Sequence, residues 1–462
     1  MSNSYLFPLS PDEQVSSLLT HERRISIGYP SLLSSTLQVA DRIVLVQSTR
    51  QQVLPYTLKI ASINRPALTA VVEVEQAYNA PISLERASQV LPKSKQVSGG
   101  NFSYITLSDT EYRAMIDLMG RKRMAEHDVL AHIKRYIAAR GYYFDDETLY
   151  NYHICLKTRP LVILAGLSGT GKSKLSQLYA EALGPTTRYL RVAVRPNWND
   201  DHYLLGYFDT ITREYITEPA VDFVLDAGRD QDNLYFFCLD EMNLAHVEYY
   251  FSQFLSALEE ERPEERYISL LSKRTQGLLR DGSGDITAEL AIPPNLLFTG
   301  TINVDETTQP LSDKVIDRAN TIEFFEVELD KIPPRQPLPD PITILTATWQ
   351  SYQARQPDTT YTSLIVEIGK LLNEMDMGLG YRVLREIEMY LANSKGLLDP
   401  QVAFDLQVKQ RILPRVRGTE AIKEPLNDLL TFMKRNTLSR SEQRLDEMKR
   451  RLARDGYTSF WR

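Results

Sequence analysis

The residues from Gly166 to Ser173 combine glycines, hydroxyls and one lysine in the spacing G-x-x-x-x-G-K-S. Closely spaced glycines let the backbone curl so that successive N–H groups point inward, where they can hydrogen-bond phosphate oxygens. A lysine at the end of such a loop reaches the β- and γ-phosphates of a nucleotide, and the hydroxyl after it is a ligand for Mg²⁺. The predicted nucleotide contacts are Gly166, Leu167, Ser168, Gly169, Thr170, Gly171, Lys172, Ser173 and Lys174.

The segments on either side of this loop are the ones that a phosphate site needs. Residues 161–165 form an apolar run typical of a buried strand, and residues 174–183 have helical character before a Gly-Pro stop signal. A helix that begins at the loop adds the positive end of its dipole. A chance match within a Gly/Ser loop, which is the alternative, does not account for both flanks. We therefore expect the chain to bind a nucleoside triphosphate.

A pair of acids follows a second apolar run. Residues 234–239 read as a strand, and Asp240 and Glu241 come directly after it. Asp240 is expected near Mg²⁺ and its waters, and Glu241 is expected to polarise the attacking water. Strand ends often carry acids for other reasons, but the position of the pair after a full phosphate loop favours catalysis.

Two further polar residues follow in the same part of the chain. Asn303 ends a third apolar run, where it could position the water or contact the γ-phosphate; alternatively, it caps a turn. Arg318 lies at a predicted helix end, and such an arginine stabilises phosphate charge on a neighbouring subunit. The alternative for Arg318 is a surface salt bridge with Asp313 or Asp317.

The order of these features resembles the AAA+ ATPases. Three segments are similar in sequence to the motor subunits of McrBC-type, modification-dependent restriction systems: residues 194–207, 239–259 and 299–319. The resemblance covers roughly residues 150–462. It implies an α/β core with a parallel sheet, an α-helical lid, a homo-oligomeric ring of six subunits and a separate McrC-like nuclease subunit.

The resemblance also assigns an arginine of the lid. Residues 378–382 would open a lid helix, and Arg382 would be the second sensor that reaches the γ-phosphate, with Arg385 as its rival and surface charge as the alternative for both. McrB motors hydrolyse GTP and carry Asn-x-x-Asp after the sensor strand, whereas here Asp305 comes one residue early and Glu306 takes the expected place. Either ATP or GTP is therefore expected as substrate, with Mg²⁺ as cofactor.

The predicted fold class is an α/β AAA+ core with a helical lid, preceded by a small β-rich domain. In that first domain, residues 41–47, 57–62 and 68–75 read as strands of a small barrel or curled sheet. Ser108 and Glu111 match a capping box before a helix. The predicted boundaries are 1–120 for the β-rich domain, 121–158 for a helical connector, 159–330 for the core, 331–345 for a proline-rich linker and 346–462 for the lid with basic C-terminal helices.

The flanks are the expected places for DNA recognition. The resemblance assigns target reading to residues 1–120, where aromatic side chains could stack a flipped, modified base or simply form the core: Tyr29, Tyr56, Tyr78, Phe102 and Tyr104. Residues 409–462 hold fourteen Lys/Arg and seven Asp/Glu, which could contact phosphates or form a solvated helix face.

Composition narrows the class of protein further. Only two cysteines occur, Cys155 and Cys238, too few for a disulfide framework or a thiolate metal cluster, so a reducing cytoplasm is expected. We expect no membrane partner and no secretory signal, because no run has the length of a membrane span and the first residues lack a basic and an apolar region. No nuclease constellation is evident.

Two other classes of function stay open. A MoxR-like protein remodeller would use the same motor on a polypeptide or to insert a metal. A nucleotide-gated scaffold with little turnover is less compatible with the intact pair Asp240 and Glu241.

Overall fold

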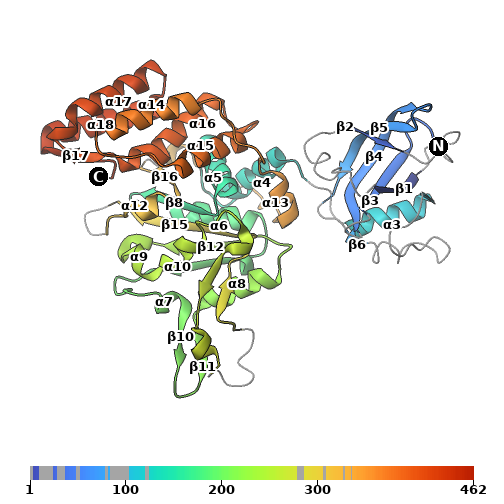
Figure 1. Ribbon diagram of the computed structural model, residues 1–462, viewed down its shortest axis with the longest axis horizontal. Coiled ribbons are helices and arrows are strands. Elements are labelled where there is room, and N and C mark those ends of the chain that lie inside the picture. The colour runs from blue at the N-terminus through green and yellow to red at the C-terminus, as the bar shows by residue number, and fades with distance from the viewer. Residues whose placement is uncertain are drawn as a thin grey trace. The chain divides into compact units, whose positions relative to one another are not determined.

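The structure is a computed structural model that describes residues 4–9, 24–28, 37–47, 52–78, 82–83, 104–119, 124–277, 286–304, 309–325, 328–334 and 336–461. The chain divides into two compact units, Met1–Ala125 and Glu126–Arg462 (Figure 1). The segment 121–158, expected as a helical connector, places α4 (Glu126–Ala139) and α5 (Asp146–Thr158) in the second unit.

The first unit is built around one sheet, as its strand-rich sequence predicts. Its strand order is β2-β5-β4-β3-β1-β7, and β6 pairs with β4. The bounds are β1 (Ser4–Leu9), β2 (Arg24–Gly28), β3 (Arg42–Gln47), β4 (Gln52–Asn64), β5 (Thr69–Ala77), β6 (Ile82–Ser83) and β7 (Ile105–Leu107). Among the described strands of this sheet, only β1 and β3 pair in parallel.

Alternation along β3 buries both faces of this sheet. Ile43 and Leu45 pack in one apolar cluster, while Val44 and Val46 pack in another with Met115 of α3 (Asp109–Met119). The capping box before α3 is confirmed, because the Glu111 amide donates to Ser108 Oγ and the Ser108 amide donates to Glu111.

The aromatic residues proposed to stack a base are placed differently from one another. Tyr56 is buried in the first of these clusters and Tyr78 in the second, so both serve the core. Tyr104 is half-buried and makes an edge-to-face contact with Tyr5. Tyr29 and Phe102 lie outside the described residues.

The second unit contains a five-stranded parallel sheet in the order β16-β8-β15-β12-β9. Its strands are β8 (Leu161–Gly166), β9 (Tyr189–Ala193), β12 (Tyr235–Asp240), β15 (Leu296–Asn303) and β16 (Asn320–Phe324). All six residues of β8 are buried, which is why its sequence is an unbroken apolar run rather than an alternating one. Helices on this unit include α6 (Lys172–Ala182), α8 (Pro219–Arg229), α9 (Val247–Tyr250), α10 (Ser252–Ala257) and α12 (Asp313–Ile316).

Two short hairpins extend this core. One joins β10 (Gly206–Asp209) to β11 (Glu214–Thr217) after α7 (His202–Leu205), and Figure 1 shows it projecting from the sheet. The other pairs β13 (Tyr267–Ser269) with β14 (Glu289–Ala291), and the short α11 (Lys273–Gln276) follows β13.

The C-terminal region is helical, as predicted, and Figure 1 shows α14, α15, α16, α17 and α18 grouped together. It comprises α13 (Thr346–Ser351), α14 (Thr362–Asn373), α15 (Tyr381–Ser394), α16 (Pro400–Gln407), a π-helix (Val408–Ile412), α17 (Lys423–Arg435), α18 (Ser439–Asp455) and the strand pair β17 (Arg417–Thr419) with β18 (Tyr457–Ser459). Its basic residues differ in exposure. Arg444 is buried against Glu323, whereas Arg454 is largely exposed and pairs with the adjacent Asp455.

One buried arginine fastens these helices to the sheet. Arg411, in the π-helix, is 1% exposed and donates to the carbonyls of Ile316, the last residue of α12, and of Ala319, just before β16. It also pairs with Glu386 of α15. Orphan carbonyls at a helix end need a donor, and a cation is favoured there, so Arg411 caps α12 with a side chain from the C-terminal region.

Candidate nucleotide-hydrolysis site

The loop after β8 has the shape that its glycines predict. Gly171 has φ +93° and ends the loop at the start of α6, a conformation that other residues adopt only with strain. Gly166 is required for a different reason, because a Cβ there would lie 1.8 Å from the Phe324 carbonyl oxygen of β16. The two glycines let the loop lie close to the neighbouring strand and turn into the helix.

Lys172 is the first residue of α6, and its side chain folds back over the loop. The side chain is buried, and Nζ donates to the carbonyl oxygens of Gly166, at 3.1 Å, and Leu167, at 2.5 Å. An ammonium group in this place puts a positive charge next to the curled backbone. A phosphate bound in the loop would meet that charge together with the N-terminal amides of α6.

The parallel sheet brings the acid pair to the same edge as this loop. Asp240 ends β12, and its Oδ1 accepts hydrogen bonds from the hydroxyls of Ser173 and Thr301, the latter at 2.9 Å. The structure therefore places the predicted Mg²⁺ ligands Ser173 and Asp240 in direct contact. Oxygen donors of this kind are the ligands that Mg²⁺ prefers.

Glu241 adopts a strained backbone conformation directly after Asp240. Its φ and ψ are 54° and 46°, in the left-handed region that non-glycine residues rarely occupy. Two hydrogen bonds hold it there: its amide donates to Thr301 Oγ1 at 2.9 Å, and its Oε1 accepts from Asn303 Nδ2 at 3.2 Å. Strain of about 1–3 kcal/mol that is held by specific contacts points to a functional position.

Sequence reasoning missed three residues of this site. Thr301 bridges the two acids. Asn243 exchanges hydrogen bonds with the backbone of Asn303, at 2.8 and 3.2 Å. Arg191, on β9, places its Nε 3.4 Å from Asp240 Oδ2. A signal existed for Thr301, because it lies two residues before Asn303 and so shares its face of the strand. Arg191 is on another strand and gave no signal.

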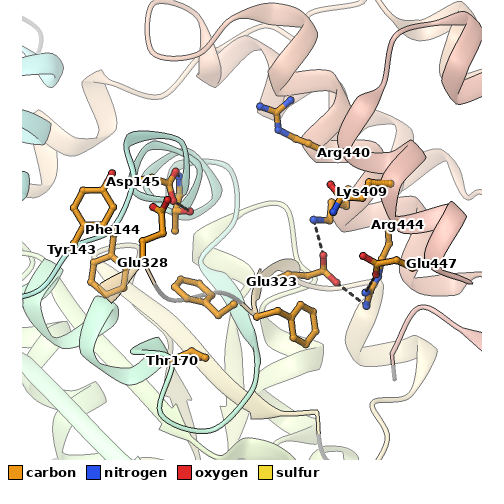
Figure 2. A pocket seen from close by; sticks show the side chains of 14 residues that line it. Tyr143, Phe144, Asp145, Thr170, Glu323, Glu328, Lys409, Arg440, Arg444 and Glu447 are labelled. Atoms are coloured by element: carbon orange, nitrogen blue, oxygen red, sulfur yellow. Dashed lines mark hydrogen bonds and ion pairs between the residues drawn. The ribbon is translucent and has the colours of Figure 1, made fainter. Parts of the chain in front are cut away.

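A cavity of about 310 Å³ adjoins the phosphate loop (Figure 2). Thr170 of the loop lines it, and so do Tyr143 and Phe144 from the segment between α4 and α5. The Phe144 ring lies close to the loop, since a Cβ on Gly171 would contact it at 3.4 Å.

The opposite wall of the cavity comes from the C-terminal helices. Glu323 pairs there with Lys409 at 2.7 Å and with Arg444 at 2.9 Å, and Figure 2 draws both contacts. Arg440 and Glu447 of α18 complete this side. Because five separate segments contribute, no single motif in the sequence predicts the cavity.

The two predicted phosphate-contacting arginines lie together. Arg318 Nη2 is 2.5 Å from Glu259 Oε2, and Arg382 Nη1 pairs with Glu259 Oε1. The alternative partners of Arg318, Asp313 and Asp317, are paired with other arginines instead. The rival Arg385 is separate: it pairs with Glu261 at 2.9 Å and is largely exposed.

The two cysteines supply no reactive thiol to this site. Both cysteines are buried, and burial raises the pKa of the Cys238 thiol to about 12 and that of Cys155 well above its usual value. Neither thiol is therefore ionised for chemistry near neutral pH. Asp305 and Glu306, which bear on the choice between ATP and GTP, fall outside the described residues.

A phosphate loop beside a hydroxyl-bridged acid pair on a parallel sheet defines a P-loop nucleoside triphosphatase. Residues 161–319 match the family model described as the AAA domain of the dynein-related subfamily, so this part of the chain is an AAA domain. Residues 344–457 match a family described as a domain of unknown function, DUF8727. No curated protein is significantly similar to the chain.

Three solved structures that are similar to the chain have low sequence identity to it. A "putative ATPase" from Cytophaga hutchinsonii is 13% identical, with 67% of this chain and 96% of that chain covered and a TM-score of 0.43. Protein Atu2648 from Agrobacterium tumefaciens is 13% identical over 26% of this chain and 94% of that chain, with a TM-score of 0.21. ASCH from Zymomonas mobilis is 12% identical, with 25% of this chain and 94% of that chain covered and a TM-score of 0.18. TM-scores this low bear on neither fold nor function.

Among the described helices, none is both long enough and apolar enough to cross a membrane.

Replacing Thr301 by valine should lower the turnover of nucleotide at least about tenfold, since it removes two hydrogen bonds and a loss of about 1.4 kcal/mol alone has that effect on a rate. The substitution keeps the shape of the side chain but leaves the Glu241 amide without its acceptor and Asp240 without one donor. Thr301→Ser, which keeps the hydroxyl, should retain most activity. Steady-state phosphate release measures both, and a valine variant within twofold of the parent would contradict the bridging role.

Proposed function

We propose that the chain is an AAA+ nucleoside triphosphatase that assembles as a homo-oligomeric ring, of six subunits, and hydrolyses ATP or GTP. The observation that carries the proposal is a continuous hydrogen-bonded run beside the phosphate loop, made by Ser173, Asp240, Thr301, Glu241 and Asn303. A run of this kind fixes a general base and a metal ligand at one edge of the sheet. A protein that only bound phosphate would not require the strained Glu241.

The residues divide the work as follows. The amides of the loop and the Lys172 ammonium hold the β- and γ-phosphates and offset their charge. Glu241 accepts a hydrogen bond from the attacking water and so raises its nucleophilicity. Asn303, hydrogen-bonded to Glu241 Oε1, sets the direction of that carboxylate.

The oxygen donors also fit a divalent cation. Ser173 and Asp240 would hold Mg²⁺, since their oxygens already lie in contact and hard cations prefer such ligands. When bound, Mg²⁺ neutralises charge on the phosphate oxygens.

The cavity beside the loop suits the nucleoside part of the substrate. It begins at Thr170 and is lined on one side by the rings of Tyr143 and Phe144, against which a base can stack.

Phe144→Ala should raise the Kd for ATP and for GTP about tenfold, because the base loses one stacking contact. Tripolyphosphate, which has no base, should bind the variant as it binds the parent protein; an equal loss for both ligands would place the nucleoside elsewhere.

Arg318 and Arg382 are proposed to act on the nucleotide of a neighbouring subunit. Both guanidinium groups converge on Glu259, whereas the charged group over the chain's own loop is Lys172. Arginine suits this role because its planar fork of donors matches phosphate oxygens and stays charged at any working pH. A ring then follows, since each site needs the arginines of the next copy.

Mixing two inactive variants tests the shared site. Lys172→Ala removes phosphate binding and Arg318→Ala removes the donated arginine, so each alone should keep at most about a thousandth of the activity, as expected for an arginine supplied in trans. In a mixture, a Lys172→Ala subunit can offer its Arg318 to the intact loop of an Arg318→Ala subunit. Phosphate release should reappear on mixing; if the mixture stays inactive although light scattering shows mixed oligomers, the arginine does not act between subunits.

The biological role proposed is that of motor and DNA-recognition subunit in a McrBC-like restriction or antiphage system. The support is the sequence resemblance around Asp240 and Arg318 to McrB-type motors, and no nuclease motif is evident in the sequence. Hydrolysis would drive movement on DNA, and an McrC-like partner would cut it. The N-terminal unit would read the target, with a modified base as the expected feature.

A MoxR-like protein remodeller is the second candidate. One observation favours it: residues 1–120 carry ten Lys/Arg and ten Asp/Glu, so this region has no excess positive charge for DNA. The same motor would then pull on a polypeptide.

Stimulation of turnover separates the two roles. We expect hydrolysis to rise several-fold with duplex DNA and the partner nuclease, because substrate engagement favours the closed, active subunit arrangement. A folded client protein serves as the matched comparison. Stimulation by the client and not by DNA or the nuclease would reject the restriction role and support the remodeller.

A further inference from the structure

Glu259 follows α10 and lies between two arginines that are distant in sequence. Each of its carboxylate oxygens takes one partner: Oε2 lies 2.5 Å from Arg318 Nη2, and Oε1 pairs with Arg382 Nη1. Arg318 follows α12 in the AAA domain, whereas Arg382 is the second residue of α15 in the C-terminal helices. One carboxylate therefore joins two parts of the second unit.

The two guanidinium groups would repel each other without a carboxylate between them. Two like charges that share one small counter-ion repel each other, and the repulsion is several times stronger near a protein surface than in bulk water. Arg318 has little room to move away, since its side chain is 18% exposed, but Arg382 is twice as exposed, at 36%. Loss of the carboxylate should thus free Arg382 first.

No other described acid takes the place of Glu259 beside Arg382. Glu386 is nearest, but its Oε1 lies 3.8 Å from Arg382 Nε, beyond hydrogen-bond distance. Glu386 is also held by Arg159, at 2.6 Å, and by the buried Arg411. Because two other arginines share Glu386, its negative charge is largely offset, and Glu259 is the main counter-ion of Arg382.

We propose that Glu259 is a positioning residue that holds Arg318 and Arg382 side by side as one anion-binding pair, and that this pair exists only while the C-terminal helices are docked. A guanidinium group has five N–H donors, so each arginine keeps donors for a phosphate after pairing with Glu259. The inference rests on the proposed function, in which these arginines meet the phosphates of a neighbouring subunit. It adds the device that arranges them before the phosphate arrives.

The test compares Glu259→Gln with Glu261→Gln, a control two residues away whose partner, Arg385, lies outside the pair. Glu259→Gln should lower kcat by up to about a hundredfold, as expected when a charged group is misplaced by about an ångström. KM and the Kd for a fluorescent nucleotide should not change, because binding depends on the subunit's own loop. Glu261→Gln should behave as the parent protein, and Glu259→Asp should recover part of kcat.

A double-mutant cycle with Arg382→Gln separates positioning from a purely structural role. If Glu259 acts through Arg382, Glu259→Gln should lower kcat by a smaller factor in the Arg382→Gln background than in the parent. Equal factors in both backgrounds would overturn the proposal. So would a rise in kcat for Glu259→Gln, which would mean that the carboxylate blocks the arginines, or no change at all.

Arg318→Ala distinguishes failure of this inference from failure of the proposed function. If Arg318→Ala keeps full turnover, the arginine has no role in hydrolysis and both fail. If Arg318→Ala is inactive while Glu259→Gln is normal, only the inference fails. Should Glu259→Gln not fold, as judged by thermal unfolding, the kcat of Glu259→Asp with and without Arg382→Gln gives the same cycle.

Discussion

The register between three parallel strands is the constraint on which the site depends. Gly166, at the end of β8, lies opposite Asn303 of β15, and Gly300 of β15 lies opposite Leu239 of β12. Parallel strands end at the same edge of a sheet, so the phosphate loop, the acid pair and the sensor asparagine emerge side by side. A shift of one residue in β15 would turn Thr301 and Asn303 to the other face and remove both of their contacts with Glu241.

Hydrogen bonds between residues at that edge fix the orientation of the acid pair and of Asn303. Thr301 contacts both acids, and Asn243 exchanges hydrogen bonds with the backbone of Asn303 from the turn after β12. The left-handed Glu241 is stable only because these neighbours fix it from both sides. The buried sheet is stable enough to hold Glu241 in its strained backbone conformation, which would relax in an isolated loop.

Electrostatics link this edge to the C-terminal helices. Arg411 caps α12 from the π-helix, Arg444 of α18 pairs with Glu323 of β16, and Glu259 joins Arg318 to Arg382. Ion pairs that are partly screened from water are costly to break singly, because an unpaired charge would remain. Motion of the C-terminal helices would therefore change the arginine pair and the cavity wall together, which gives a physical route from nucleotide state to subunit arrangement.

The sequence by itself determined the phosphate loop, the three strands that carry Gly166, Asp240 and Asn303, and the helical C-terminal region. These features are local: apolar runs, glycine spacing and polar residues at strand ends are written in consecutive positions. The sequence also indicated Arg318 and Arg382 as phosphate contacts, but each separately and without a shared partner. Only the tertiary structure decided that they share Glu259, that Thr301 bridges the acids, and that four further segments enclose a cavity with the loop. The physical reason is that such contacts join residues from separate elements, so their partners depend on how the sheet and the helices pack and not on spacing along the chain.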